Sequence, residues 1–504
     1  ELIKTLVRQG HQHANITNEK DLIQNLRTQL SLLNDYQFSD TEWETFSKTH
    51  LTNPNSGIIE KTELIQENHV LNLIRDDGTT KNISLIDKKN LGKNSVQVIN
   101  QYREEKGHHK TRYDVTILVN GLPLVHIELK RRGVPLKEAF NQINRYQYES
   151  FWAGSGLFEF IQIFVISNGT HTKYYSNTTR DSHIRENTPG ARKSVKKTSN
   201  SFEFTSCWAD AKNHNIQDLT DFAQTFCKKH TLLSVITRYC VFTAEKLLLV
   251  MRPYQIAATE RILKKIQISS AYGTAGTLDA GGYIWHTTGS GKTLTSFKTA
   301  QLAVDLPDID KVLFVVDRKD LDYQTILEYD KFEKGAANSN KSTAVLKKQL
   351  ENKDAKIIVT TIQKLDVFIS KNPKHEIYHM HVVLVFDECH RSQFGKMHTA
   401  IIKHFTNYHL FGFTGTPIFA VNAGSSKNPR LKTTQQAFGE KLHTYTIVNA
   451  IHDGNVLPFR VDYINTIKQK DDTKDKQGHA EGLVADLSQL PCRKGAYGKT
   501  NERK

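Results

Sequence analysis

The sequence predicts an α/β fold in which a mixed α/β domain precedes a lobe built on a parallel sheet. Three observations indicate the second lobe: a glycine-rich turn within residues 283–293, a strand ending in two carboxylates within residues 382–390, and continuous apolar runs around them. Unbroken apolar runs are typical of strands covered by helices on both faces. We therefore expect domains at 1–240 and 247–462. The tail at 463–504 is expected to be disordered or to begin another lobe.

Composition narrows the class of partner. The 504 residues suit two to four domains, and the formal net charge of +15 favours a polyanion such as DNA or RNA, with a merely basic surface as the alternative. The five cysteines include no C-x-x-C pair, and we expect them to be reduced thiols. No apolar run is long enough for a membrane span and no signal peptide is recognisable, so we expect a cytoplasmic location without membrane contact. Because residue 1 is glutamate, the sequence is expected to begin inside a longer product.

The glycine-rich turn predicts a nucleoside triphosphate site. Its backbone N–H groups would wrap phosphate oxygens at the start of a helix, which adds its positive end. The residues of this turn are Thr288, Gly289, Ser290 and Gly291. Lys292 would reach the β- and γ-phosphates, and the Thr293 hydroxyl would bind Mg²⁺. His286 stands where the usual pattern has its first glycine. After the second strand, Asp387 suits a metal contact and Glu388 the orientation of an attacking water.

Further segments resemble motifs of superfamily two helicases. Residues 252–255, Arg-Pro-Tyr-Gln, resemble the adenine-contacting Q motif, and residues 411–417 resemble the motif that follows the carboxylate strand. All of the segments occur in the order found in those motors. The resemblance implies a RecA-like lobe that uses ATP and Mg²⁺, with Arg252 and Gln255 beside the base.

The N-terminal half contains a second candidate site. Residues 112–130 read as two strands around an Asn-Gly turn, with Asp114 on the first strand and Glu128 and Lys130 on the second. Two neighbouring carboxylates can hold Mg²⁺, which polarises a scissile phosphate, while a lysine orients or activates the attacking water. The arrangement resembles that of the PD-(D/E)xK nucleases. The alternative is an acidic–basic pair on a purely structural hairpin.

The period of two along a strand makes this hypothesis testable. A strict two-residue turn would place Asp114 opposite Ile127 and point Glu128 away from it. The chemistry therefore requires an odd loop or a bulge near Gly121 to Pro123. Proline, which has no N–H to give to a ladder, makes such an irregularity plausible.

A helix is predicted after the second strand, at residues 136–146. Gln142 and Tyr146 are four apart and hence share one helical face. They resemble the Q-x-x-x-Y element that follows E-x-K in some of these nucleases, which adds them to the catalytic candidates.

A nuclease of this kind followed by such a motor resembles the restriction (R, motor) subunit of type I restriction-modification enzymes. The resemblance covers most of residues 1–465, including residues 317–325 and 387–395. It implies ATP-dependent translocation of double-stranded DNA and Mg²⁺-dependent cleavage remote from the recognition site. It also implies separate modification (methyltransferase) and specificity subunits as partners, in the bacterial cytoplasm. No second-lobe motif follows Pro417, so the chain is expected to be an N-terminal fragment that binds ATP without translocating alone.

Two other functions remain open from the residues. One is a DNA-repair helicase whose N-terminal domain grips DNA. The other is a catalytically silent, nucleotide-binding interaction module.

Overall fold

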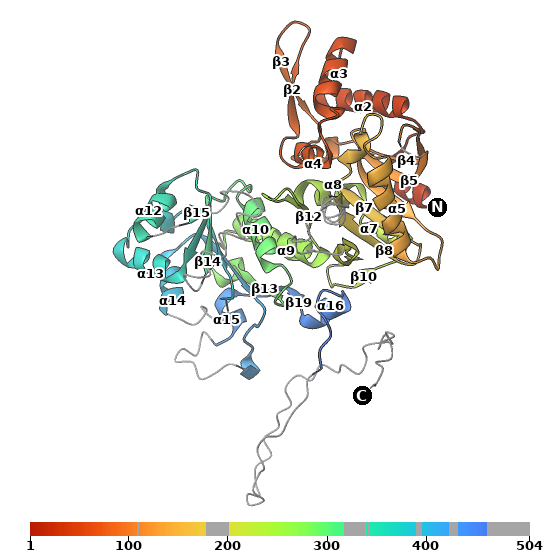
Figure 1. The fold of residues 1–504 in the computed structure, drawn as a ribbon. Helices are drawn as coiled ribbons and strands as arrows, with labels where there is room; N and C mark the ends of the chain where they lie inside the picture. The colour runs from red at the N-terminus through yellow and green to blue at the C-terminus, as the bar shows by residue number, and fades with distance from the viewer. Residues whose placement is uncertain are drawn as a thin grey trace, which may run out of the picture. The chain divides into compact units, whose positions relative to one another are not determined.

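The computed structural model describes residues 1–107, 110–177, 201–316, 338–339, 342–389, 396–422 and 432–460 (Figure 1). The expected tail at 463–504 lies outside these residues, as do residues 317–325 and 390–395 of the resemblance. The chain divides into one compact unit at Glu1–Leu457 and a second at Pro458–Lys504. The described helices and strands all lie in the first unit. None of the helices in the described segments combines the length and apolar content that crossing a bilayer requires.

The N-terminal half is built on a mixed six-stranded sheet with the order β1-β4-β5-β6-β7-β8. Its strands are β1 (Gln12–His13), β4 (Val96–Glu104), β5 (Thr111–Val119), β6 (Leu122–Leu129), β7 (Ile163–Ser167) and β8 (Thr172–Ser176). The strands β4, β5 and β6 form an antiparallel meander, whereas β6 and β7 run parallel. A parallel pair needs a crossover, and α5 (Leu136–Glu149) supplies it, lying against β6 and β7 (Figure 1).

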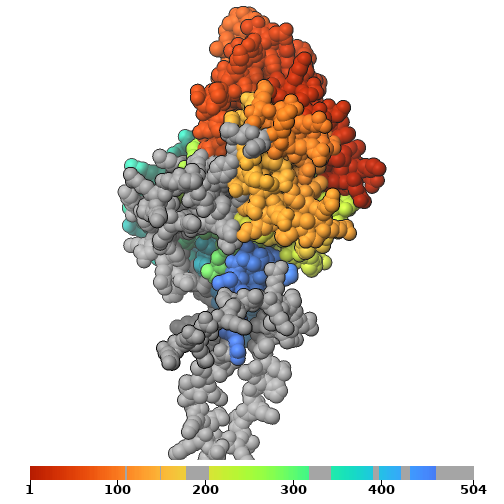
Figure 2. Space-filling view, turned by 45° about the vertical axis from the view of Figure 1, so that its right-hand side comes forward, coloured from red at the N-terminus to blue at the C-terminus, as the bar shows by residue number. Residues whose placement is uncertain are grey.

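Other helices and hairpins pack around this sheet on one shared apolar core. The helices are α1 (Leu2–Arg8), α2 (Glu19–Asn34), α3 (Asp40–Phe46), α4 (Ile58–Gln66), α7 (Leu219–Thr225) and α8 (Lys229–Arg238). The hairpins are β2 (Val70–Ile74) with β3 (Thr80–Ser84), β9 (Trp208–Ala209) with β10 (Asn215–Ile216), and β11 (Cys240–Phe242) with β12 (Leu248–Val250). In the space-filling view the red and orange residues before about 100 pack directly on the yellow-orange residues that follow (Figure 2).

The hairpin β5–β6 contains the predicted irregularity. Asn120 and Gly121 both have positive φ, 51° and 84°, as a two-residue turn requires. Val119 pairs with Leu122 next to the turn, but after a register shift Val115 pairs with Ile127. Leu124 is the extra residue of this bulge, since its neighbours pair with Leu118 and Ile117. Continued by one residue, this register places Asp114 opposite Glu128. The prediction of a bulge is therefore confirmed.

Gly121 also allows a close approach between this turn and α2. A Cβ at residue 121 would stand 2.6 Å from the Cα of Leu26, whereas a Cβ at Gly133, whose φ is 87°, would meet nothing within 4 Å. We expect Gly133→Ala to destabilise the fold by about 1 kcal/mol, through its positive φ alone. Gly121→Ala adds a clash with backbone and is expected to cost roughly 1–3 kcal/mol more. Urea unfolding of the two variants measures the difference, and equal costs would contradict the packing.

The second lobe is a seven-stranded parallel sheet with the order β15-β16-β14-β17-β18-β13-β19. Its strands are β13 (Gly282–His286), β14 (Lys311–Val316), β15 (Asn338–Ser339), β16 (Ile357–Thr361), β17 (Val382–Phe386), β18 (Tyr408–Thr414) and β19 (Lys441–Tyr445). Every residue of β14, β16, β17 and β18 is buried. The expected parallel sheet of unbroken apolar strands, and with it the α/β class, is confirmed.

Helices cover both faces of this sheet, as two separate apolar clusters show. One cluster joins the sheet to α12 (Thr343–Glu351), α13 (Ile362–Lys371) and α14 (Lys396–His404), and the other joins it to α9 (Pro253–Ala271) and α10 (Lys292–Ala303). Two short helices, α15 (Thr434–Phe438) and α16 (Ile447–His452), flank β19. Because β17, β18 and β13 are adjacent and parallel, the segments after them meet at one edge, where α/β sheets bind ligands.

Candidate active site

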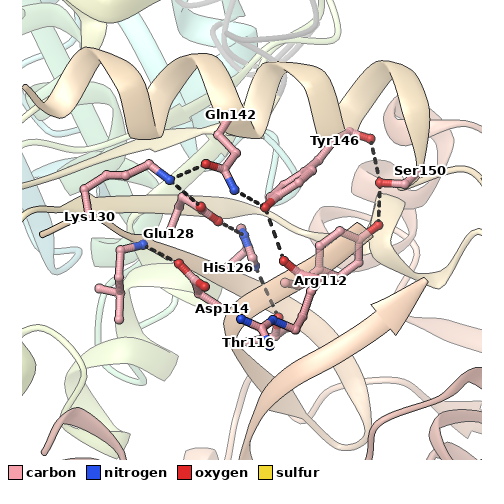
Figure 3. A network of polar contacts seen from close by, with 11 residues as sticks. Arg112, Asp114, Thr116, His126, Glu128, Lys130, Gln142, Tyr146 and Ser150 are labelled. Carbon is pink, nitrogen blue, oxygen red and sulfur yellow. Dashed lines mark hydrogen bonds and ion pairs between the residues drawn. The ribbon is translucent and has the colours of Figure 1, made fainter. Parts of the chain in front are cut away.

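The structure brings the two predicted carboxylates of the N-terminal sheet together (Figure 3). Asp114 Oδ2 accepts a hydrogen bond of 2.9 Å from the backbone N–H of Leu129, the residue after Glu128. The Glu128 side chain is fully buried, and its Oε1 accepts a hydrogen bond of 3.1 Å from Lys130 Nζ. The sequence-predicted triad of two carboxylates and a lysine therefore lies within one small region at the end of β6.

The electrostatics of this pair suit a bound cation. Burial, and next the negative charge of Glu128, raise the pKa of the Asp114 carboxyl. Glu128 Oε2 is buried without a hydrogen-bond partner among the described residues, which is costly for a carboxylate oxygen. Oxygen donors of this kind are the ligands that Mg²⁺ prefers, completed by water or phosphate oxygens. Within the described residues no group of three or more His, Cys, Asp or Glu could hold a metal, so these two carboxylates would need such additional ligands.

The raised pKa of Asp114 predicts a stability cost at neutral pH. A carboxyl whose pKa is higher in the folded than in the unfolded chain favours folding only while it is protonated. The contribution is therefore lost as pH rises from the ordinary value of 3.8 through the raised value. We expect Asp114→Asn to be more stable than the parent at neutral pH, with the gap closing on acidification. Thermal melts across this range test the sign, and a less stable variant at neutral pH would contradict it.

Helix α5 contributes the predicted glutamine and tyrosine to the same network (Figure 3). Lys130 Nζ donates to Gln142 Oε1, and Gln142 Nε2 donates to the Tyr146 hydroxyl. That hydroxyl in turn donates to the carbonyl oxygen of Arg112, at 3.3 Å. Burial raises the pKa of Tyr146, so the phenol keeps its proton. The helix thus contributes a second partner to the lysine beside Glu128.

Sequence reasoning missed one residue of this region, His126. Its Nε2 lies 3.4 Å from Glu128 Oε2, and both side chains are fully buried. The spacing of two residues along β6 places both side chains on one face. That period was the signal that could have found His126.

The glycine-rich turn at residues 288–291 leads directly into a helix, as predicted. Gly291 precedes α10 with φ 75°, and Lys292 is the first residue of that helix, with Thr293 next. Lys292 Nζ lies 3.5 Å from Glu388 Oε1, which brings the turn and the carboxylate strand together. Glu388 has a φ of 43°, a strained value for a residue with a side chain and one that clusters at functional sites. Asp387 immediately follows β17, and its Oδ1 accepts from the N–H of Glu388.

The segment after β18 also reaches the phosphate turn. Trp285 Nε1 donates to the carbonyl of Gly415, at 3.1 Å. A Cβ on Gly415 would stand 3.4 Å from Thr288 Oγ1. The helicase-like segment at 411–417 and the turn are therefore direct neighbours.

The predicted base-contacting residues Arg252 and Gln255 lie at the start of α9 as expected, but the side-chain amide of Gln255 faces the turn. Gln255 Nε2 donates to the carbonyls of Ser290 and Gly291, at 3.2 and 3.3 Å, and its Oε1 accepts from the N–H of Arg252. Gly291 has a φ of 75°, which favours glycine, and a Cβ there would also come within 2.7 Å of that same Nε2. Arg252, Gln255 and Gly289 line a pocket of about 230 Å³ beside the turn.

His286, at the position of the usual first glycine, is a buried part of this lobe. Its Nε2 lies 2.9 Å from Nδ1 of His443 on β19. Burial, and next the neighbouring His443, hold the pKa of His286 well below its usual value, so the ring is neutral. The side chain therefore packs against the neighbouring strand β19.

Comparisons with known proteins match a protein family to each half of the chain. Residues 2–183 match the family described as type I restriction enzyme R protein N terminus, and residues 254–489 match the SWI2/SNF2 ATPase family. The type I restriction enzyme EcoprrI endonuclease subunit of Escherichia coli is 50% identical over 270 residues, 53% of this chain and 81% of that protein. The chain belongs to the family of type I restriction enzyme endonuclease subunits.

Two longer relatives show how much of their length this chain covers. The SauCOLORF180P endonuclease subunit of Staphylococcus aureus is 43% identical over 93% of this chain and 47% of its own length. The SsaAORF53P endonuclease subunit of Staphylococcus saprophyticus is 41% identical over 96% of this chain and 49% of its own length. This type I endonuclease subunit chain therefore spans about half the length of these relatives.

Proposed function

We propose that this chain carries the cleavage centre and part of the motor of a type I restriction enzyme. A PD-(D/E)xK nuclease domain at 1–240 would precede a RecA-like first lobe at 247–462, with 463–504 as a tail or the start of a second lobe. The observation that supports the cleavage centre most directly is the bulge at Leu124, because it sets Asp114 opposite Glu128.

In the cleavage centre, Asp114 and Glu128 would hold Mg²⁺. The ion supplies Lewis-acid polarisation of the scissile phosphate when bound. Lys130 would orient the attacking water by a hydrogen bond from its ammonium group, which lies against Glu128. Gln142 and Tyr146 keep that ammonium group in place through their linked hydrogen bonds.

In the motor, the N–H groups of the turn would cradle the phosphates of ATP. The turn residues in this role are Thr288, Gly289, Ser290 and Gly291. Lys292 is proposed to bind the β- and γ-phosphates, Thr293 and Asp387 the accompanying Mg²⁺, and Glu388 the attacking water. Arg252 and Gln255 would border the base, as the pocket beside the turn supports.

The proposed substrate is double-stranded DNA, translocated with ATP and cut away from the recognition site. Exposed basic residues on β5, after β6 and on α5 support a phosphate-binding surface around the carboxylates. They are Arg112, Arg131, Arg132, Lys137 and Arg145. The names of the relatives describe subunits of restriction enzymes, so we propose modification and specificity subunits as partners in a bacterial cytoplasm.

The test is plasmid cleavage by the complete assembly of this subunit with its modification and specificity subunits. The proposal expects double-strand breaks that require ATP, Mg²⁺ and an unmodified recognition site. Unwinding of a short duplex without any metal-dependent nicking would favour a repair helicase instead. Nucleotide binding with neither cleavage nor hydrolysis, in the complete assembly, would favour a silent interaction module.

A further inference from the structure

His126 lies inside the N-terminal sheet, two residues before Glu128 on β6 and with no exposed surface. Four aromatic rings surround its imidazole with centroid distances of 5.7 to 6.4 Å. They belong to Tyr113, Tyr146, Phe151 and Phe164. These rings form a cage and pack against the imidazole at interplanar angles of 75° to 80°.

Both nitrogens of His126 face polar groups of the site (Figure 3). Nδ1 lies 3.2 Å from the hydroxyl oxygen of Thr116, on β5. Nε2 faces Glu128 Oε2 at 3.4 Å, and neither of these two atoms has a hydrogen-bond partner within the described part of the chain. Two buried, unsatisfied polar atoms this close together satisfy each other after a shift of a few tenths of an ångström.

We propose that His126 is a positioning residue for the metal ligand Glu128, an inference that rests on the proposed function. The Thr116 hydroxyl donates to Nδ1, which leaves the ring proton on Nε2. That N–H holds Glu128 Oε2, so the carboxylate keeps a single orientation toward the metal and Lys130. No three-ligand metal cluster occurs among the described side chains, so His126 acts through Glu128 and not as a third ligand.

Partners that orient a metal ligand typically contribute 10–100-fold in metal affinity. The test is Mn²⁺ binding to the nucleotide-free full chain, followed by electron paramagnetic resonance. The Mn²⁺ binding that is lost in Asp114→Asn is the component that belongs to the proposed site. His126→Phe keeps an aromatic ring in the cage but removes the donor, and is expected to weaken that component about tenfold or more. His126→Gln restores an N–H donor and is expected to bind close to the parent value.

A matched control exists in the second lobe. His398 is also fully buried beside two phenylalanines, and neither ring nitrogen has a hydrogen-bond partner in the described structure. His398→Phe makes the same chemical change away from the carboxylates and is expected to leave Mn²⁺ affinity unchanged.

Unchanged Mn²⁺ affinity in a folded His126→Phe would overturn the inference, as would equal losses in His126→Phe and His126→Gln. If His126→Phe does not fold, as circular dichroism would report, the isosteric Thr116→Val decides. It removes the group that fixes the ring tautomer, so weaker Mn²⁺ binding supports the role and parent-like binding refutes it. Absence of any Asp114-dependent binding in the parent chain would instead sink the proposed metal site itself, and this inference with it.

Discussion

Replacement of Lys130 by alanine in the complete assembly is expected to abolish DNA cleavage while ATP hydrolysis continues. The ammonium group of Lys130 lies between Glu128 and Gln142, where it can orient the attacking water and take part in proton transfer. Loss of a positioned acid–base group typically slows a reaction by about 10²–10⁴-fold. Asp114→Ala is expected to have the same outcome, because it removes a metal ligand. Plasmid cleavage and phosphate release, measured on the same preparation, report the two activities separately.

Lys48→Ala is a suitable control for this variant. It removes the same side chain from an exposed position, where the lysine pairs with Glu44 one helical turn away. Cleavage should be unaffected. Retained cleavage in Lys130→Ala would refute the assignment of the site, and loss of ATP hydrolysis together with cleavage would show that the variant damages more than the nuclease.

Lys292→Ala is expected to affect the other activity first. The lysine begins α10 and lies near Glu388, and the proposed function assigns its ammonium group to the terminal phosphates. Removing one such charge-stabilising group costs roughly 10²–10³-fold in rate. ATP hydrolysis by the complete assembly should fall by that factor. If cleavage depends on translocation, DNA cutting falls with it.

Lys264, an exposed lysine on α9, provides the matched control, and its replacement by alanine should leave both activities intact. Normal restriction by Lys292→Ala would show that cleavage and translocation are not coupled in this enzyme. Normal ATP hydrolysis by the same variant would remove the lysine from the nucleotide site.

Much of this structure could be predicted from short-range patterns in the sequence. The unbroken apolar runs at β14, β16 and β17 could form only strands buried on both faces, and a parallel sheet follows. Because side chains alternate along a strand, the hairpin needed one extra residue for Asp114 to face Glu128. The structure has this residue at Leu124. Which residue would bulge could not be predicted, because the alternation of side chains fixes only that one extra residue is needed and not where it lies.

Long-range contacts account for what the sequence could not reveal. Gln255 fits the base-contacting pattern, yet its amide is engaged by the carbonyls of Ser290 and Gly291, some 35 residues away. The contact between His286 and His443 joins β13 to β19, and nothing local to either residue indicates it. Such pairings depend on the order of strands in the sheet, and this order is a property of the whole fold.

The central claim is that Asp114 and Glu128 share one divalent cation beside Lys130. Crystals of the chain grown with Mn²⁺ and without nucleotide test it most directly, through the anomalous scattering of the metal. The account predicts an anomalous peak in contact with oxygens of both carboxylates, absent in crystals of Asp114→Asn. A fully occupied peak elsewhere with none at this pair, or carboxylates still bound only to Lys130 and Leu129 at saturating Mn²⁺, would contradict it.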